Sequence, residues 1–112
     1  MNDVPTITVL DSEDAATVVG AGELDLHNGD KFRAALKQAD ASGKNVVVDL
    51  RNANYIDTAI LALLVMGSKD AMVHEKTLRV LIAQGSHPQY VLKTVGFADI
   101  MEIVVADKEA AI

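Results

Sequence analysis

The sequence has no cysteine among its 112 residues, and basic residues are few. The absence of cysteine excludes disulfide bonds, thiolate nucleophiles and thiolate metal ligands, and it agrees with a reducing compartment. The 10 Lys and Arg residues stand against 16 Asp and Glu residues, which leaves a formal net charge of -6. Because this charge repels phosphate backbones and anionic lipid surfaces, nucleic acids and membrane surfaces are poor partner candidates.

Long apolar segments are also missing. The longest uninterrupted run, Ala59 to Met66, is far shorter than the roughly 20 residues that a transmembrane helix needs. The N-terminal stretch MNDVPTITVL lacks the charged and then apolar pattern of a signal peptide. We therefore expect a cytoplasmic protein that does not insert into membranes.

The composition is typical of one globular domain, with 50% hydrophobic and 23% charged residues. The chain shows no internal repeat, linker or low-complexity stretch. The sequence therefore predicts a single domain over residues 1–112, with a core at about residues 6–105 and a loosely held tail at residues 106–112.

The N-terminal part of the chain predicts two strands and a helix. Residues 6–10 and 16–24 are rich in β-branched side chains, and the polar segment DSEDA between them indicates a hairpin. Asn28 or Asp30 is expected to cap the following helix, which ends at the turn ASGKN. Its apolar residues recur at helical spacing: Phe32, Ala35, Leu36 and Ala39.

A buried strand and a long helix are predicted next. The short apolar run VVVDL at residues 46–50 is typical of a buried parallel strand. We interpret RNANYI as a loop that leads from this strand into a helix from about Thr58 to His74.

The C-terminal part predicts two more strands, LRVLIA at residues 78–83 and MEIVV at residues 101–105. Between them, HPQYVLKTVG indicates a short helix with Pro88 in its first turn and Gly96 at its end. The resulting order, β-β-α-β-α-β-α-β, predicts an α/β domain. Its four- to five-stranded sheet is expected to be mostly parallel, with helices packed against it and the first strand antiparallel at an edge.

Common enzyme and nucleotide motifs are incomplete. GAGELD at residues 20–25 begins like a dinucleotide fingerprint but has Asp25 where the third Gly belongs, and SGKN lacks the first Gly of a P-loop. Neither MGSKD nor QGSHP forms a nucleophile elbow. We therefore expect no cofactor and no catalytic residue of these classes.

The histidines and carboxylates also give no clear catalytic or metal site. His27, His74 and His87 share no metal-binding spacing, so we predict no metal and interpret them as surface or helix-end residues. The carboxylates of Asp25, Asp49 and Asp57 leave acid-base chemistry open. For Asp49 the simpler interpretation is a strand-end residue that faces a loop.

The pair Asp57-Thr58 stands where functional groups gather in open α/β sheets, at the carboxyl end of a parallel strand. A helix N-terminus there exposes unpaired N–H groups, which suit a capping Asp or Thr and also stabilise a phosphate. Taken alone, the pair favours capping.

The helix that starts at Thr58 carries two apolar stripes. One consists of Ile60, Leu63, Leu64 and Ala71, and the neighbouring one, which also contains Thr58, of Leu61, Ala62, Val65 and Met72. A helix packed on a sheet needs only one apolar stripe. The second stripe either packs against the last helix or is an exposed docking surface for a partner, and the sequence leaves both open.

Four segments together resemble a known family: GELDLHNGDKFRAAL, VVVDLRNANYIDTAILALLV, RVLIA and VLKTVGFADIMEIV. In this order and spacing they resemble the STAS domain family, most closely the bacterial anti-sigma factor antagonists. The resemblance covers about residues 6–105. It implies a single STAS-like domain that is not an enzyme.

The resemblance also implies a regulatory site. In the antagonists, a hydroxyl residue directly after an Asp is phosphorylated by a partner serine kinase that is also the anti-sigma factor. By resemblance, Thr58 is the phosphoacceptor, and Asp25 and Asp57 flank it. The implied partner-binding residues are Glu23, Asp25, Leu61, Ala62 and Val65.

The implied mechanism is partner switching. The unphosphorylated antagonist binds an anti-sigma factor of the GHKL serine/threonine kinase type and frees the sigma factor. Phosphorylation of Thr58 blocks this binding, and a phosphatase is a further implied partner.

The stretch around Thr58 departs from the family pattern. The family has Asp-Ser-Ser-Gly-Leu or Asp-Ser-Thr-Gly-Leu, whereas this chain has Asp57-Thr58-Ala59-Ile60-Leu61. We expect the bulky Ile60, in place of Gly, to crowd the approach of a kinase.

Three alternatives remain open. The Asp-Thr-Ala stretch is also similar to that of the STAS subunit of an ABC-type lipid transporter, and a STAS scaffold of a sigma-regulating assembly is another possibility. A small enzyme that uses Asp25, Asp49 or Asp57 would need a substrate-binding loop longer than any in this sequence.

Overall fold

Five strands form a single sheet in the computed structural model, which describes residues 4–97 and 100–108. The strands lie in chain order across the sheet: β1 (Thr6–Asp11), β2 (Ala15–Leu24), β3 (Asn45–Ile56), β4 (Leu78–Ile82) and β5 (Glu102–Val105). β1 pairs antiparallel with β2, and every other neighbouring pair is parallel. The predicted mostly parallel sheet with an antiparallel edge strand is confirmed.

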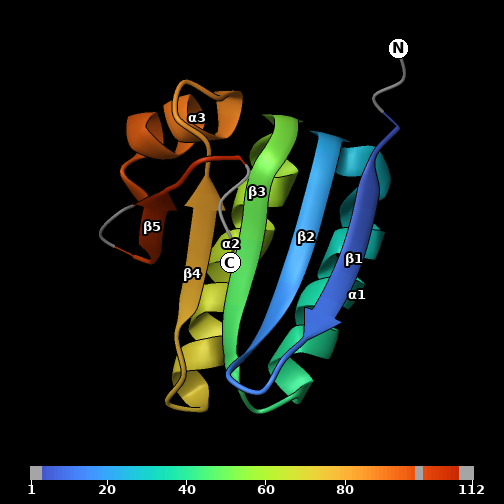
Figure 1. Cartoon of the computed structure of the whole chain (residues 1–112), viewed down its shortest axis with the longest axis vertical. Coiled ribbons are helices and arrows are strands. Elements are labelled where there is room, and N and C mark those ends of the chain that lie inside the picture. The colour runs from blue at the N-terminus through green and yellow to red at the C-terminus, as the bar shows by residue number, and fades with distance from the viewer. Residues whose placement is uncertain (1–3, 98–99, 109–112) are drawn as a thin grey trace.

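The helical segments are η1 (Leu26–Asn28), α1 (Gly29–Ala41), α2 (Thr58–Val73) and α3 (His87–Val95). Figure 1 shows α1 and α2 together on one face of the sheet and α3 beyond the carboxyl end of β4. Gly96 adopts a φ of 74° in the left-handed region and closes α3, as the sequence predicts. None of the described helices is long and apolar enough to cross a membrane.

The core lies between the sheet and the two helices α1 and α2. Alternate residues of β3 point into it, and they meet Phe32 of α1 and Leu64 of α2. The core packs closely on Gly20 of β2: a Cβ at this position would lie 2.8 Å from Leu24 Cδ1 and 3.3 Å from Leu50 Cδ2, so these side chains would have to shift. The predicted core stripes of α1 and α2 are both buried.

The prediction of a loop at RNANYI, residues 51–56, is wrong, because β3 continues through this segment to Ile56. Pairing with β2 persists over this segment, and Leu24 still pairs with Ile56 at the end of the two strands. Two register shifts interrupt the ladder, between Val19 and Ala21 and between Gly22 and Glu23. These irregularities break the alternation of buried and exposed residues that identifies a strand in a sequence.

The interpretation of Asp49 as a strand-end residue is also wrong. Asp49 lies in the middle of β3, its exposed fraction is 5%, and it forms a bidentate ion pair with Arg51. Arg51 Nε donates to Asp49 Oδ1 at 2.9 Å, and Arg51 Nη2 donates to Oδ2 at 2.9 Å. Residues i and i+2 of a strand share a face, so the guanidinium reaches the carboxylate within one strand.

Arg51 also connects the sheet to the segment that follows β5. Its Nη1 donates to the carbonyl oxygen of Asp107 at 2.9 Å, and the Ala106 N–H donates to the carbonyl of Ile82 at 2.9 Å. The start of the predicted tail is thus bonded to the sheet, while residues 109–112 of that tail lie outside the described residues.

Candidate functional site

The ends of β2 and β3 place two acidic residues side by side. Leu24 pairs with Ile56, and the next residue of each strand, Asp25 or Asp57, begins a helical segment. The structure therefore brings together two of the predicted site residues, which are far apart in the sequence. Glu23, two residues earlier on β2 than Asp25, is exposed at the same edge.

Asp57 caps α2 and ties it to the connection after β2. Its Oδ1 accepts from Ala59 N–H at 3.0 Å and Ile60 N–H at 3.2 Å, and its Oδ2 accepts from Leu26 N–H at 3.0 Å. The carboxylate satisfies free N–H groups of the first helical turn and stabilises the positive end of the helix dipole. Both oxygens of Asp57 are thus engaged in structure.

Asp25 has the same role at η1. Its Oδ1 accepts from His27 N–H at 2.9 Å, and Asn28 Oδ1 accepts from Asp25 N–H at 3.0 Å, which completes a capping box. Asp25 and Asp57 therefore organise the two turns next to Thr58.

Thr58 is the first residue of α2 and is exposed. Its hydroxyl makes no hydrogen bond to another described residue. Of the Asp57-Thr58 pair, the Asp alone supplies the side-chain cap, so the hydroxyl is not required for the helix. A free, exposed hydroxyl at this position is chemically available for modification.

The expectation that Ile60 crowds the approach to Thr58 is wrong. The Ile60 side chain is 0% exposed, because it points from α2 into the core. A larger residue in place of Gly therefore adds core packing on the sheet side of the helix and leaves the outer side of Thr58 unobstructed.

The second apolar stripe of α2 is divided in the structure. Leu61 is buried and lines a hollow that α2 shares with α3. Val65 is half-buried, whereas Ala62 and Met72 are exposed. The stripe thus faces the hollow beside α3 at Leu61 and solvent at Ala62 and Met72, and a docking role for its exposed part stays a prediction.

The hollow beside Thr58 has a volume of about 290 Å³ and contains two residues that the sequence did not point to, Tyr55 and His87. Their rings stack with centroids 4.6 Å apart and an interplanar angle of 23°. His87 lies, as expected, at a helix end, but it is also in contact with the end of β3. Only the fold brings these two residues together, because they are distant in the sequence.

The described residues contain no group of three or more His, Asp or Glu side chains placed to hold a metal ion. His27 and His74 each lie near a single carboxylate, at 3.3 Å from Asp25 and 3.4 Å from Asp40. The described part of the chain thus offers no metal-binding cluster at the strand ends.

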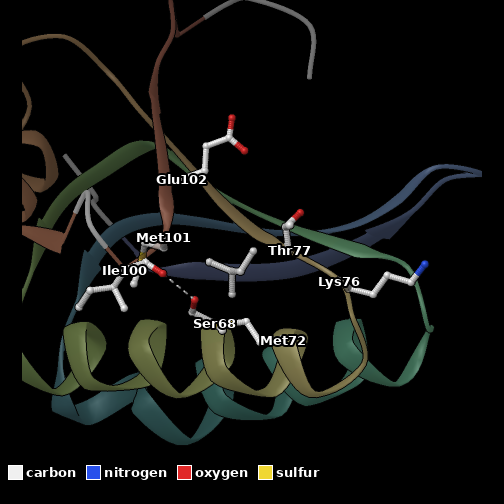
Figure 2. Close-up of a pocket in the computed structure, with 8 residues that line it drawn as sticks. Ser68, Met72, Lys76, Thr77, Ile100, Met101 and Glu102 are labelled. Carbon is white, nitrogen blue, oxygen red and sulfur yellow. Dashed lines mark hydrogen bonds between the residues drawn. The ribbon is translucent and has the colours of Figure 1, made fainter.

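Another hollow, of about 360 Å³, lies toward the other end of α2 (Figure 2). Ser68 Oγ donates to the carbonyl of Ile100 at 3.2 Å across it, and Lys76 and Glu102 point away from it. Ser68 is ten residues from Thr58 along the helix, about 15 Å at 1.5 Å per residue. This hollow is therefore separate from the site at Thr58.

Replacing Asp57 with Ala is expected to lower the free energy of unfolding by about 1 to 2 kcal/mol, because the cap on Ala59 and Ile60 and the bond to Leu26 are lost. Urea denaturation of the wild type and the variant measures this difference. Asp57→Asn is the matched control, since its amide oxygen still accepts from the helix. An Ala variant as stable as the wild type would contradict the capping role.

Comparison with protein families gives one match over nearly the whole chain. The model of the family described as "Mlab, STAS domain" matches residues 7–105. The matched segment includes β1 from its second residue, the other four strands, the three α-helices and the turns at Asp25 and Asp57.

Solved structures share the fold at low sequence identity. An anti-sigma factor antagonist from Mycobacterium paratuberculosis has a TM-score of 0.81 at 16% identity, covering 93% of this chain and 88% of that chain. The antagonist SpoIIAA in its unphosphorylated form has a TM-score of 0.75 at 15% identity, covering 93% and 90%. Bacillus SpoIIAA in its phosphorylated form has a TM-score of 0.65 at 18% identity, covering 93% and 94%. These three structural neighbours are anti-sigma factor antagonists.

Proposed function

Because this chain belongs to the STAS domain family, we propose that it is an anti-sigma factor antagonist that acts by partner switching. The unphosphorylated form binds an anti-sigma factor that is also a GHKL-type serine/threonine kinase, and the sigma factor is released. The kinase transfers the γ-phosphoryl group of ATP to Thr58 Oγ1, which releases ADP and the hydroxyl proton, and the phosphorylated form no longer binds. A phosphatase restores the binding form.

The observation that carries this proposal is the state of Thr58. Its hydroxyl is exposed and unbonded among the described residues, while Asp57 alone caps the helix. A phosphate on Thr58 adds about -1.5 to -2 charges at neutral pH and breaks no hydrogen bond of the fold. A modification here therefore changes the surface without unfolding the domain.

The proposed partner surface surrounds Thr58. Glu23 and Asp25 supply negative charge at the strand ends, and Ala62 and Val65 supply an apolar patch on the outer side of α2. Leu61 is buried and takes part from the wall of the adjacent hollow. Adding phosphate to this surface increases its negative charge, and an apolar or acidic partner surface resists that charge.

Replacing Thr58 with Glu is expected to weaken partner capture by about 100-fold, because an unpaired charge is placed in the contact. The free energy of unfolding should stay within about 0.5 kcal/mol of the wild type, because Thr58 is an exposed surface residue. Immobilised wild type and variant are exposed to native cell lysate, and mass spectrometry identifies the retained proteins. A GHKL-type kinase on the wild type alone supports the switch.

Thr58→Ser is the matched control for this experiment. It keeps the hydroxyl and removes only a methyl group, so capture should equal that of the wild type. Capture of the same kinase by the Glu variant at undiminished affinity would overturn the proposed switch at Thr58.

The stretch Asp57-Thr58-Ala59 favours a second candidate, a STAS subunit of an ABC-type lipid transporter. Such a subunit binds a nucleotide-hydrolysing ATPase, so the same capture would recover ATPase and permease subunits on both variants. Retention of many copies of STAS proteins would instead indicate a scaffold. In each case the domain acts in the bacterial cytoplasm by binding proteins and is not an enzyme.

A further inference from the structure

His87 connects the start of α3 to the end of β3. Its Nδ1 accepts a hydrogen bond from the Ile56 N–H at 3.1 Å, and its ring stacks on Tyr55. A neutral imidazole has one N–H, and a ring nitrogen that accepts a hydrogen bond cannot carry it. The hydrogen of the neutral His87 ring is therefore on Nε2, which makes Nε2 a donor held in a fixed orientation.

Thr58 and His87 line the same hollow, together with Leu61 and Val91. Thr58 is exposed, whereas His87 is half-buried. A group attached to Thr58 Oγ1 therefore lies at the edge of a space that His87 also borders. The charged group that borders this space is the carboxylate of Asp57, which repels a phosphate.

Three of the backbone amides that could bind a phosphate at the N-terminus of α2 are already in use. In α2, Ala59 and Ile60 donate to Asp57 Oδ1, and Leu61 donates to the Asp57 carbonyl. A phosphate on Thr58 therefore finds these three amides occupied, and a side chain that borders the hollow can supply a further donor.

Two amides in the first turn of α3 are also in use, and Pro88 in the same turn has none. Gln89 N–H donates to Ser86 Oγ at 3.3 Å, Tyr90 N–H donates to the Ser86 carbonyl at 3.2 Å, and Pro88 has no N–H. The side chains that border the hollow and can donate to a group on Thr58 are then His87 and Tyr55. Only His87 has its donor atom oriented by a hydrogen bond on the opposite side of the ring.

We propose that His87 Nε2–H binds the phosphate carried by Thr58 and holds it over the hollow between α2 and α3. This inference rests on the proposed phosphorylation of Thr58 and assigns His87 as the positioning residue of the phosphorylated state. The phosphate then changes the partner surface in two ways: it adds negative charge and it covers the apolar wall formed by Leu61 and Val91.

The test uses protein with phosphothreonine installed at position 58 by synthesis, so that no kinase is needed. His87→Asn keeps an amide oxygen near the position of Nδ1 to accept from Ile56, but it has no group at the position of Nε2. His87→Gln keeps an amide N–H near the position of Nε2. Tyr55→Phe keeps the ring stack and removes only the hydroxyl.

Unfolding equilibrium constants are measured for each chain with and without the phosphate. The wild type and His87→Asn, each with and without phosphate, form a double-mutant cycle. The factor by which phosphate changes the unfolding constant should differ about tenfold between the two chains, because the variant lacks the hydrogen bond to the charged phosphate. In His87→Gln and Tyr55→Phe, phosphate should change the unfolding equilibrium constant by nearly the same factor as in the wild type. Coupling below about twofold in the His87→Asn cycle would overturn the assignment.

A second measurement needs no variant. In the NMR spectrum of the wild type, the Nε2–H resonance of His87 should move downfield and exchange more slowly with water when Thr58 carries phosphate. An unchanged Nε2–H resonance would overturn the inference, even if a His87 variant failed to fold. Neither result depends on partner capture, so a failure here is distinguishable from a failure of the proposed partner switch.

Discussion

Replacing Asp49 with Ala should lower the free energy of unfolding by about 3 to 5 kcal/mol. The change leaves the Arg51 guanidinium buried in the sheet without the carboxylate that now accepts from its Nε and Nη2. The hydrogen bond to Asp49 raises the pKa of Arg51 above its ordinary value, against the opposing effect of burial, and the negative charge of Asp49 adds to the rise. The contribution of the raised Arg51 pKa is fully present below the ordinary pKa of an arginine and is lost as the pH rises through the higher pKa of the folded state.

The exposed pair of Arg79 and Glu102 is the matched control for Asp49. Their Nε to Oε1 distance is 3.1 Å, but the side chains are 50% and 53% exposed. Glu102→Ala should therefore change the free energy of unfolding by less than about 1 kcal/mol. Urea denaturation of both variants measures the contrast, and equal effects at the two positions would contradict the importance of burial for the Asp49 pair.

Replacing Ile60 with Ala should lower the free energy of unfolding by about 2 to 5 kcal/mol, because it leaves a cavity under the first turn of α2. The side chain is 0% exposed and packs within the main core. Partner capture should persist wherever the variant remains folded, because the Thr58 hydroxyl lies on the outer side of the helix.

Met66→Ala is the control on the same helix. Met66 is 49% exposed, so its replacement should cost no more than about 0.5 kcal/mol. Thermal denaturation compares the two variants, and a binding assay with the captured kinase measures their affinities. An Ile60 variant that keeps the stability of the wild type but loses partner binding would contradict the structural role of Ile60.

The order of strands and helices was predictable because local patterns agree with it. Residues 46–50 form a nearly continuous apolar run within β3, interrupted by Asp49, and the α1 core residues recur at helical spacing. Asp57 was predictable as a helix cap from its residue type and position. These features depend on neighbours that are close in the sequence.

The second half of β3 was not predictable in the same way. Asn52 and Asn54 are exposed polar residues that resemble a loop, and the strand is sustained by pairing with β2 through two register shifts. The ion pair of Asp49 and Arg51 could have been predicted from their spacing, because residues two apart on a strand lie on the same face. A buried carboxylate needs such a partner.

The residues that line the hollow beside Thr58 could not be predicted from local sequence patterns. Ile56 and His87 are 31 residues apart and meet only when α3 packs beside the end of β3. The environment of each residue in the second apolar stripe of α2 was also unpredictable, because the sequence does not show which of these residues lie next to α3. Leu61 lines the hollow between these helices and Ala62 is exposed, although both residues are apolar neighbours in the chain.

Phosphate on Thr58 is proposed to control partner binding. The most direct measurement is the affinity of the purified kinase for this protein, before and after incubation with ATP, with the modified residue located by mass spectrometry. We expect phosphate on Thr58, none on a Thr58→Val variant, and an affinity about 100-fold lower after modification. Modification at another residue, or phosphate on Thr58 with unchanged affinity, would contradict the claim.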